Sequence, residues 1–213
     1  AKAKALQIDI TINTDVFLIK NNICEIFKKN KLNLISVNKK WLNLETSYLA
    51  AKQLFSYYKS NVPETFKAPH KFPLLLRFKK NEEKIVYNIK ELTNILNVLK
   101  EKPLAEPYLG SEIMNIITLW DGKNIYYFDN IKNLSEVKTE RLNLIKTKLN
   151  FMFSDENADF VGFFLIKLVW FENDWYVLGF MANPEFNKTE FYHKKDLLYI
   201  LNAAIYQKLN EIS

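Results

Sequence analysis

The sequence is short of the residues that most often carry catalysis. Its 213 residues include one cysteine, two histidines and four glycines. The single cysteine, Cys24, excludes an intrachain disulfide and a CxxC pair, and we expect it to be a small buried hydrophobe in a helix. His70 and His193 lie far apart and form no HxH or HExxH motif. A histidine- or cysteine-based metal site is therefore not predicted.

Phosphate loops and serine nucleophiles are missing as well. The glycines, Gly110, Gly122, Gly162 and Gly179, each stand alone. The sequence consequently contains no P-loop, no GxGxxG turn and no GxSxG motif. We expect Gly162 and Gly179, which can face each other, to serve a bulge or close packing inside strands. The inventory predicts no cofactor and no hydrolytic activity.

Arginine is also scarce, although the formal net charge is +6. Of 30 basic residues only Arg77 and Arg141 are arginine. A lysine-rich chain that is also rich in asparagine and isoleucine is typical of an AT-rich genome. Proteins that read phosphates or bases usually rely on the bidentate arginine fork. Nucleic-acid binding through lysines and exposed aromatics is therefore an alternative function, with weak, non-specific and salt-sensitive affinity.

The sequence does contain a recurring pattern of apolar runs. Apolar residues make up 48% of the chain and aromatic residues 15%, which is typical of a globular protein with a substantial core. Two short apolar runs joined by a polar turn, then a segment of helical period, recur four times, with turns near residues 38, 81, 122 and 173. Whether these units are true repeats stays open. This pattern predicts a single α+β domain, 1–213. Its sheet is expected to be mainly antiparallel, built from successive β-hairpin–helix units and covered by amphipathic helices.

The units can be placed along the chain. A half-buried strand at 5–13 and a helix capped by Thr14 or Asp15 precede them. The prolines of segment 62–73 mark a possible subdomain boundary, which makes 1–62 a possible subdomain. In the first unit we expect strands at 32–37 and 41–44 and a helix from Thr46, and in the second unit strands at 74–78 and 85–87 and a helix from Asn88, with Glu91 completing a capping box. In the third unit we expect strands at 113–120 and 125–128 and a helix from Ser135. In the fourth unit we expect strands at 160–171 and 175–182 and a helix from about residue 195.

The fourth hairpin is apolar on both alternating faces, so we expect its two strands to pair near the centre of the sheet with both faces covered. Residues 160–182 are long enough to cross a membrane, but Lys167 and the polar turn 172–174 interrupt them. A hairpin outside the membrane is therefore predicted. The first residues lack the apolar core of a signal peptide, which predicts a cytoplasmic protein.

Aromatic residues near two of the turns are candidates for an interface. Aromatic side chains are enriched where proteins meet, although they also fill cores. Because no catalytic machinery is evident, the leading prediction is a non-enzymatic binding or adaptor protein, an accessory, immunity or assembly component with a protein partner or self-association. The interface candidates are Trp170, Phe171, Trp175, Tyr176, Tyr126 and Tyr127.

One acidic triplet supports a second alternative, a metal-dependent nuclease. Glu82, Glu83 and Lys84 resemble the acidic-x-lysine element of restriction-type nucleases. That element needs a strand and a second acid, whereas here the pattern predicts the tip of a turn. A solvated turn is the favoured interpretation, and the triplet is only a weak metal candidate.

Overall fold

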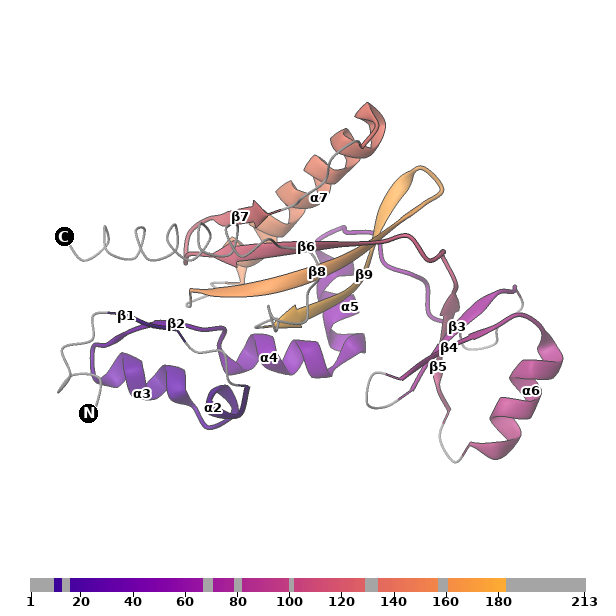
Figure 1. The fold of residues 1–213 in the computed structure, drawn as a ribbon, viewed down its shortest axis with the longest axis horizontal. Coiled ribbons are helices and arrows are strands. Elements are labelled where there is room, and N and C mark those ends of the chain that lie inside the picture. The colour runs from indigo at the N-terminus through magenta and orange to yellow at the C-terminus, as the bar shows by residue number, and fades with distance from the viewer. Residues whose placement is uncertain are drawn as a thin grey trace.

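The computed structural model describes residues 10–12, 16–66, 71–78, 82–99, 102–128, 134–156 and 161–182. The described part is elongated (Figure 1), with a larger sheet in the middle, a small sheet with one helix at one end, and a short N-terminal unit at the other. Helices and mainly antiparallel strands are combined, which confirms the predicted α+β class. No helix within these ranges is both long and apolar enough to span a membrane.

The larger sheet has four strands in the order β7-β6-β8-β9, and all its neighbours are antiparallel. It contains both the third and the fourth predicted hairpins. The third hairpin and the helix α7 that Ser135 caps are confirmed, and so is the antiparallel pairing of β8 with β9. The strand β8 is interior, as expected, but β9 lies at the edge of the sheet. The bounds are β6 (Ile113–Trp120), β7 (Ile125–Phe128), β8 (Gly162–Phe171), β9 (Asp174–Ala182) and α7 (Glu136–Asp155).

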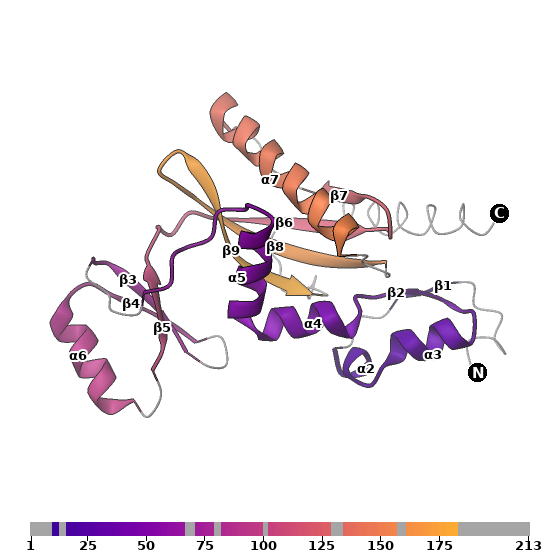
Figure 2. The same cartoon turned by 180° about the vertical axis from the view of Figure 1, so that it is seen from behind.

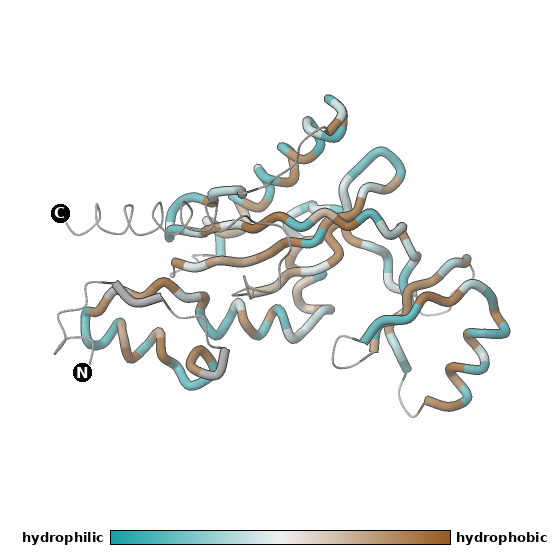
Figure 3. The backbone as a smooth tube through the Cα atoms, in the orientation of Figure 1, coloured by the Kyte–Doolittle hydropathy of each residue, from teal (hydrophilic) through white to brown (hydrophobic). Residues whose placement is uncertain are grey.

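Helices α4 (Lys39–Thr46), α5 (Tyr48–Tyr57) and α7 pack on one face of the larger sheet. Figure 2 shows the molecule from behind, with these helices in front of the sheet. Figure 3 shows hydrophobic residues running along β6 and β8. The centre of this core is an aromatic stack in which the ring of Phe153 lies 4.2 Å from that of Trp41 and 4.4 Å from that of Phe164. On the opposite face Phe163 and Leu165 are buried too, so both faces are covered, as predicted.

The small sheet has the order β4-β3-β5 and carries the second predicted hairpin. Its strands are β3 (Leu74–Arg77), β4 (Glu83–Val86) and β5 (Leu104–Pro107), and helix α6 (Ile89–Val98) packs against it. The strand β5 was not among the predicted strands. Leu92 of α6 is buried, and Ile95 is partly buried against the small sheet. The predicted boundary at 62–73 directly precedes β3 and stays a prediction.

The predicted capping box of α6 supports a first testable expectation. The Asn88 side chain accepts from the Glu91 backbone N–H at 3.0 Å, and Glu91 Oε2 accepts from the Tyr87 backbone N–H at 2.9 Å. We expect Asn88→Ala to destabilise the helix by about 1 kcal/mol, measured as faster amide hydrogen exchange along α6. The exposed Asn94→Ala in the same helix is the control and is expected to leave exchange unchanged or slower. Equal exchange in the two variants would show that the cap contributes nothing.

The N-terminal unit differs from the prediction. Strand β1 (Ile10–Ile12) pairs in parallel with β2 (Asn33–Ile35), and the start of the predicted strand 5–13 lies outside the described residues, as does the cap at Thr14 or Asp15. The single predicted helix is split into α2 (Val16–Lys20) and α3 (Ile23–Lys29), because Asn22 adopts a left-handed conformation, φ 60°. Cys24 lies in α3 as predicted but is only half-buried, and burial raises the pKa of its thiol.

The first predicted hairpin does not form. Its second strand, 41–44, is helical and belongs to α4. The Asn38 side chain accepts from the Trp41 backbone N–H at 3.2 Å and so starts a helix where a turn was expected. The helix that follows, α5, is confirmed, and it buries Ala51 and Phe55.

The two strand glycines have different roles. Gly162 pairs with Trp120, and Gly179 pairs with Lys167, so they do not face each other. A Cβ at position 162 would lie 2.8 Å from the backbone nitrogen of Val37, which explains the glycine by close approach of another chain segment. Gly179 lies at a register shift between β8 and β9, which is the expected bulge.

Candidate functional site

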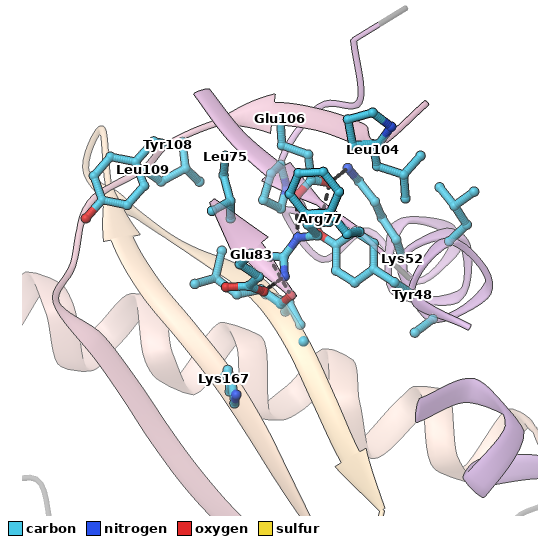
Figure 4. Close-up of a pocket in the computed structure, with 18 of the residues that line it drawn as sticks. Tyr48, Lys52, Leu75, Arg77, Glu83, Leu104, Glu106, Tyr108, Leu109 and Lys167 are labelled. Atoms are coloured by element: carbon cyan, nitrogen blue, oxygen red, sulfur yellow. Dashed lines mark hydrogen bonds and ion pairs between the residues drawn. The ribbon is translucent and has the colours of Figure 1, made fainter. Parts of the chain in front are cut away.

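A cleft separates the small sheet from the larger sheet (Figure 4), and α4 and α5 form its third side. The small sheet contributes residues of β3, β4 and β5, and the larger sheet contributes parts of β8 and β9 and the first residue of β6. Apolar and charged side chains both line it. The apolar ones include Leu49, Leu75, Leu104, Leu109, Ile113 and Met181, and the charged ones are Glu45, Lys52, Arg77, Glu82, Glu83, Lys84, Lys102, Glu106 and Lys167.

A buried carboxylate organises one wall of the cleft. The Glu106 side chain on β5 is 0% exposed. The Tyr48 hydroxyl lies 2.7 Å from Oε2, the Arg77 Nε donates to the same oxygen at 2.9 Å, and the Lys52 ammonium donates to Oε1. A buried charge is tolerated only when it is paired and hydrogen-bonded, and this one has three donors from α5 and β3. We call Tyr48, Lys52, Arg77 and Glu106 the Glu106 hub.

Arg77 connects the hub to its surroundings. Its guanidinium lies 4.2 Å from the centre of the Tyr48 ring, in a cation–π arrangement. It also forms an ion pair with Glu83 on β4, and its Nη2 donates to the Leu178 carbonyl of β9 at 3.5 Å. One arginine thus links the small sheet, α5 and the larger sheet across the cleft.

Burial shifts the pKa of two members of the hub, Tyr48 and Lys52. It raises the pKa of Tyr48 well above its ordinary range, and the negative charge of Glu106 adds to this shift. Burial also lowers the pKa of Lys52, while the hydrogen bond to Glu106 and its charge oppose that shift. The Tyr48 hydroxyl is therefore a neutral hydrogen-bond donor, and Glu106 opposes the loss of charge on Lys52.

Four of the predicted interface aromatics pack in pairs beside the β8–β9 turn, and the other two lie on β7. Trp175 is 3% exposed, and its indole nitrogen donates to the Lys138 carbonyl at 2.9 Å. Trp170 packs against Trp175 with ring centres 5.1 Å apart, and the Phe171 and Tyr176 rings pack 6.0 Å apart. On β7, Tyr127 donates to the Lys146 carbonyl at 2.7 Å, and Tyr126 is half-buried. Their role as an interface stays a prediction.

The acidic triplet does lie at the cleft, but not as the tip of a turn. Strand β4 begins at Glu83, so Glu83 and Lys84 belong to a strand. Glu83 is paired with Arg77, while Glu82 and Lys84 also line the cleft. Within the described ranges no group of three histidine, cysteine, aspartate or glutamate side chains is placed to hold a metal ion. Both histidines fall outside the described residues.

Sequence reasoning missed the Glu106 hub. Its members come from α5, β3 and β5 and are separated by up to 58 residues, as between Tyr48 and Glu106. One signal was available: Arg77 is one of only two arginines and directly follows an apolar strand. Arginine suits a buried ion pair, because its planar guanidinium binds a carboxylate at two points and is always charged.

Solved structures with a similar fold are ligases of the ATP-grasp type. Biotin carboxylase from Campylobacter jejuni, in a β,γ-ATP complex, has a TM-score of 0.60 and 14% identity over 86% of this chain and 51% of its own. D-alanine–D-alanine ligase from Bacillus anthracis, complexed with ATP, has a TM-score of 0.57 and 15% identity over 86% and 70%. Phosphoribosylamine–glycine ligase from Thermotoga maritima has a TM-score of 0.56 and 13% identity over 70% and 50%.

No family model and no curated protein matches the sequence. Because the sequences of these structures are at most 15% identical to this one, the likeness shows the fold alone. The chain spans about half the length of the biotin carboxylase and of the phosphoribosylamine–glycine ligase.

The likeness corrects the predicted function. The sequence predicted a non-enzymatic binding or adaptor protein, and that prediction is wrong, because the fold is one on which ATP-dependent ligases are built. The nucleic-acid and nuclease alternatives stay predictions. The error arose because the prediction rested on the absence of catalytic motifs, and a fold built from distant segments leaves no short motif in the sequence.

Proposed function

We propose that this chain binds ATP in the cleft between its two sheets and belongs to an ATP-dependent ligase, an enzyme that uses ATP to join two molecules. The observation that supports this most is the cleft itself. It is lined by apolar residues and by basic residues, with a buried ion-pair hub in one wall, in a fold similar to two ligases whose structures contain an ATP ligand.

The lining suits the two chemically different parts of a nucleotide. Ligand sites are mostly apolar with a few placed polar groups. Leu75, Leu104 and Leu109 can pack against the base, and Lys84 and Lys102 can meet the phosphates. Arg77 can do the same, since an arginine fork matches a phosphate as well as a carboxylate. When bound, ATP supplies the energy for bond formation, and the protein residues bind and orient it.

Isothermal titration with ATP tests the proposal. We expect saturable binding that Arg77→Gln weakens by at least about tenfold, the effect of losing one charged hydrogen bond. Arg141→Gln is the matched control, because Arg141, an exposed residue of α7, is the only other arginine and is not among the residues that line the cleft.

Lys84→Gln keeps the test independent of the buried hub. Lys84 is exposed and lines the cleft, so its replacement leaves the fold intact and is expected to weaken ATP binding by a few fold, or about 0.5–1 kcal/mol. No detectable ATP binding by the unaltered protein, or equal binding by all variants, would contradict the proposal. Cytoplasmic residence remains part of the proposal, since ATP-dependent ligases need the intracellular nucleotide.

A further inference from the structure

Helix α7 is apolar on two opposite faces. The face that packs on the larger sheet buries Leu142, Ile145, Leu149, Met152 and Phe153. On the outer face Val137 is 54%, Leu144 48% and Phe151 64% exposed. Both views show α7 at the margin of the molecule (Figure 1 and Figure 2). A helix that only covers a sheet needs one apolar face, so the second face calls for a partner outside the chain.

The three outer residues follow one another at intervals of seven. Seven residues make almost two turns of an α-helix, so Val137, Leu144 and Phe151 lie in one line along the outer surface of α7. The line is about 21 Å long at a rise of 1.5 Å per residue. A heptad line of this kind is typical of a helix that packs lengthwise against another helix.

Aromatic residues extend the line at its C-terminal end. The ring of Phe151 lies edge-on to that of Tyr58 at 5.9 Å, and Tyr58 lies edge-on to Tyr57 at 5.0 Å. Tyr57, at the end of α5, is 72% exposed. Exposed aromatic side chains are enriched where proteins meet. We call Val137, Leu144, Phe151 and Tyr57 the outer stripe.

The charges beside the outer stripe complement a second copy of α7. Glu136 and Glu140 lie on one side of the stripe and Arg141 on the other, and all three are exposed. Glu136 and Glu140 are four residues apart and repel each other within one helix. When two such helices pack in parallel, Glu136 of each lies across from Arg141 of the other, five positions further on. An antiparallel pair would instead place Arg141 opposite Lys148 of the other copy, and like charges repel.

We propose that the outer stripe binds a second copy of this chain, with the two α7 helices parallel about a twofold axis beside Leu144. Each apolar residue then meets its own counterpart, and each copy contributes one Glu136 and one Arg141 to two equivalent ion pairs. The contact is smaller than a standard interface, so we expect a weak dimer with a dissociation constant of about 100 µM. The outer-stripe residues are not among those that line the cleft, so the dimer leaves the cleft accessible.

Sedimentation equilibrium from about 10 µM to 1 mM, a range that brackets the affinity of so small a contact, tests the proposal. We expect reversible conversion of monomer to dimer. Leu144→Asp should weaken it at least about tenfold, because two carboxylates would face each other at the centre of the contact. Leu144 is 48% exposed, so this variant should keep the melting temperature of the parent.

Val98→Asp is the matched control for Leu144→Asp, because Val98 lies on α6, is 84% exposed and does not belong to the outer stripe. It should dimerise as the parent does. A protein that stays monomeric over the whole range, or a Leu144→Asp variant that dimerises like the parent, would overturn the proposal. Equal weakening by Val98→Asp would overturn it too, since the association would then not depend on α7.

Exchanging the charges tests whether two copies face each other. Arg141→Glu alone, and Glu136→Lys with Glu140→Lys together, should each weaken self-association by a few fold, as expected of exposed ion pairs. An equal mixture of these two proteins should form a heterodimer that restores the parental affinity, because every facing pair is again of opposite charge. A mixture that associates no better than the separate variants would contradict the proposed pairing.

A disulfide cross-link tests the direction of the helices. The parallel arrangement places Val137 beside Val137 of the second copy, whereas an antiparallel arrangement places it beside Phe151. In a Cys24→Ser background, which removes the single cysteine, Val137→Cys should therefore form a covalent dimer with oxidised glutathione. Thr93→Cys, at an exposed position of α6, is the control and should stay monomeric. Equal cross-linking of the two variants would overturn the parallel arrangement.

Discussion

Replacing Phe164 with aspartate should leave the protein unfolded at room temperature. Phe164 lies on the interior strand β8 and is 0% exposed. Its ring stacks on Phe153 at 4.4 Å and lies 5.8 Å from that of Phe180, so a carboxylate there would be surrounded by aromatic carbon. Truncating a buried phenylalanine alone costs about 3–5 kcal/mol, and a buried unpaired charge adds several more. That total approaches the whole stability of a typical domain.

Circular dichroism during thermal unfolding measures this effect. Val137→Asp is the matched control, because Val137 lies on α7 and is 54% exposed, and its replacement should change stability by less than about 0.5 kcal/mol. A Phe164→Asp protein that melts at the parental temperature would show that the aromatic stack is not the centre of the core.

The second large effect is expected at Glu106. Glu106→Ala removes the shared acceptor of Lys52 and Arg77 and leaves their charges without a buried partner. Breaking a buried ion pair costs about 3–5 kcal/mol. We expect about 3 kcal/mol, the lower end of that range, because the Lys52 and Arg77 side chains remain 11% and 13% exposed and can regain water.

Glu83→Ala is the control, since Glu83 binds the same Arg77 but its side chain is 48% exposed. A pair of this kind contributes less than about 1 kcal/mol. Urea unfolding of the two variants therefore gives a direct comparison of a buried and an exposed carboxylate on one arginine. Equal losses would mean that the hub owes its stability to something other than the burial of Glu106.

The local features of the fold were predictable where neighbouring residues decide them. The turn after Phe171, the hairpin around Gly122 and the Asn88 cap are set by residues within a few positions, and all three form as expected. Prediction failed at two asparagines that set the local structure differently from the expectation. Asn38 caps a helix where a turn was predicted, and Asn22 adopts a left-handed backbone conformation that divides a predicted helix.

The sequence by itself determined the α+β class, three of the four hairpins and most of the helices, because periodicity and turn chemistry act over short distances. Only the tertiary structure decided that the three hairpins divide between the small sheet and the larger sheet on the two sides of a cleft, and that Tyr48, Lys52, Arg77 and Glu106 meet in one wall of it. The physical reason is that contacts between distant segments depend on how whole elements pack. A lysine such as Lys167 therefore acquires its place at the cleft only when the small sheet comes to lie opposite β8 and β9.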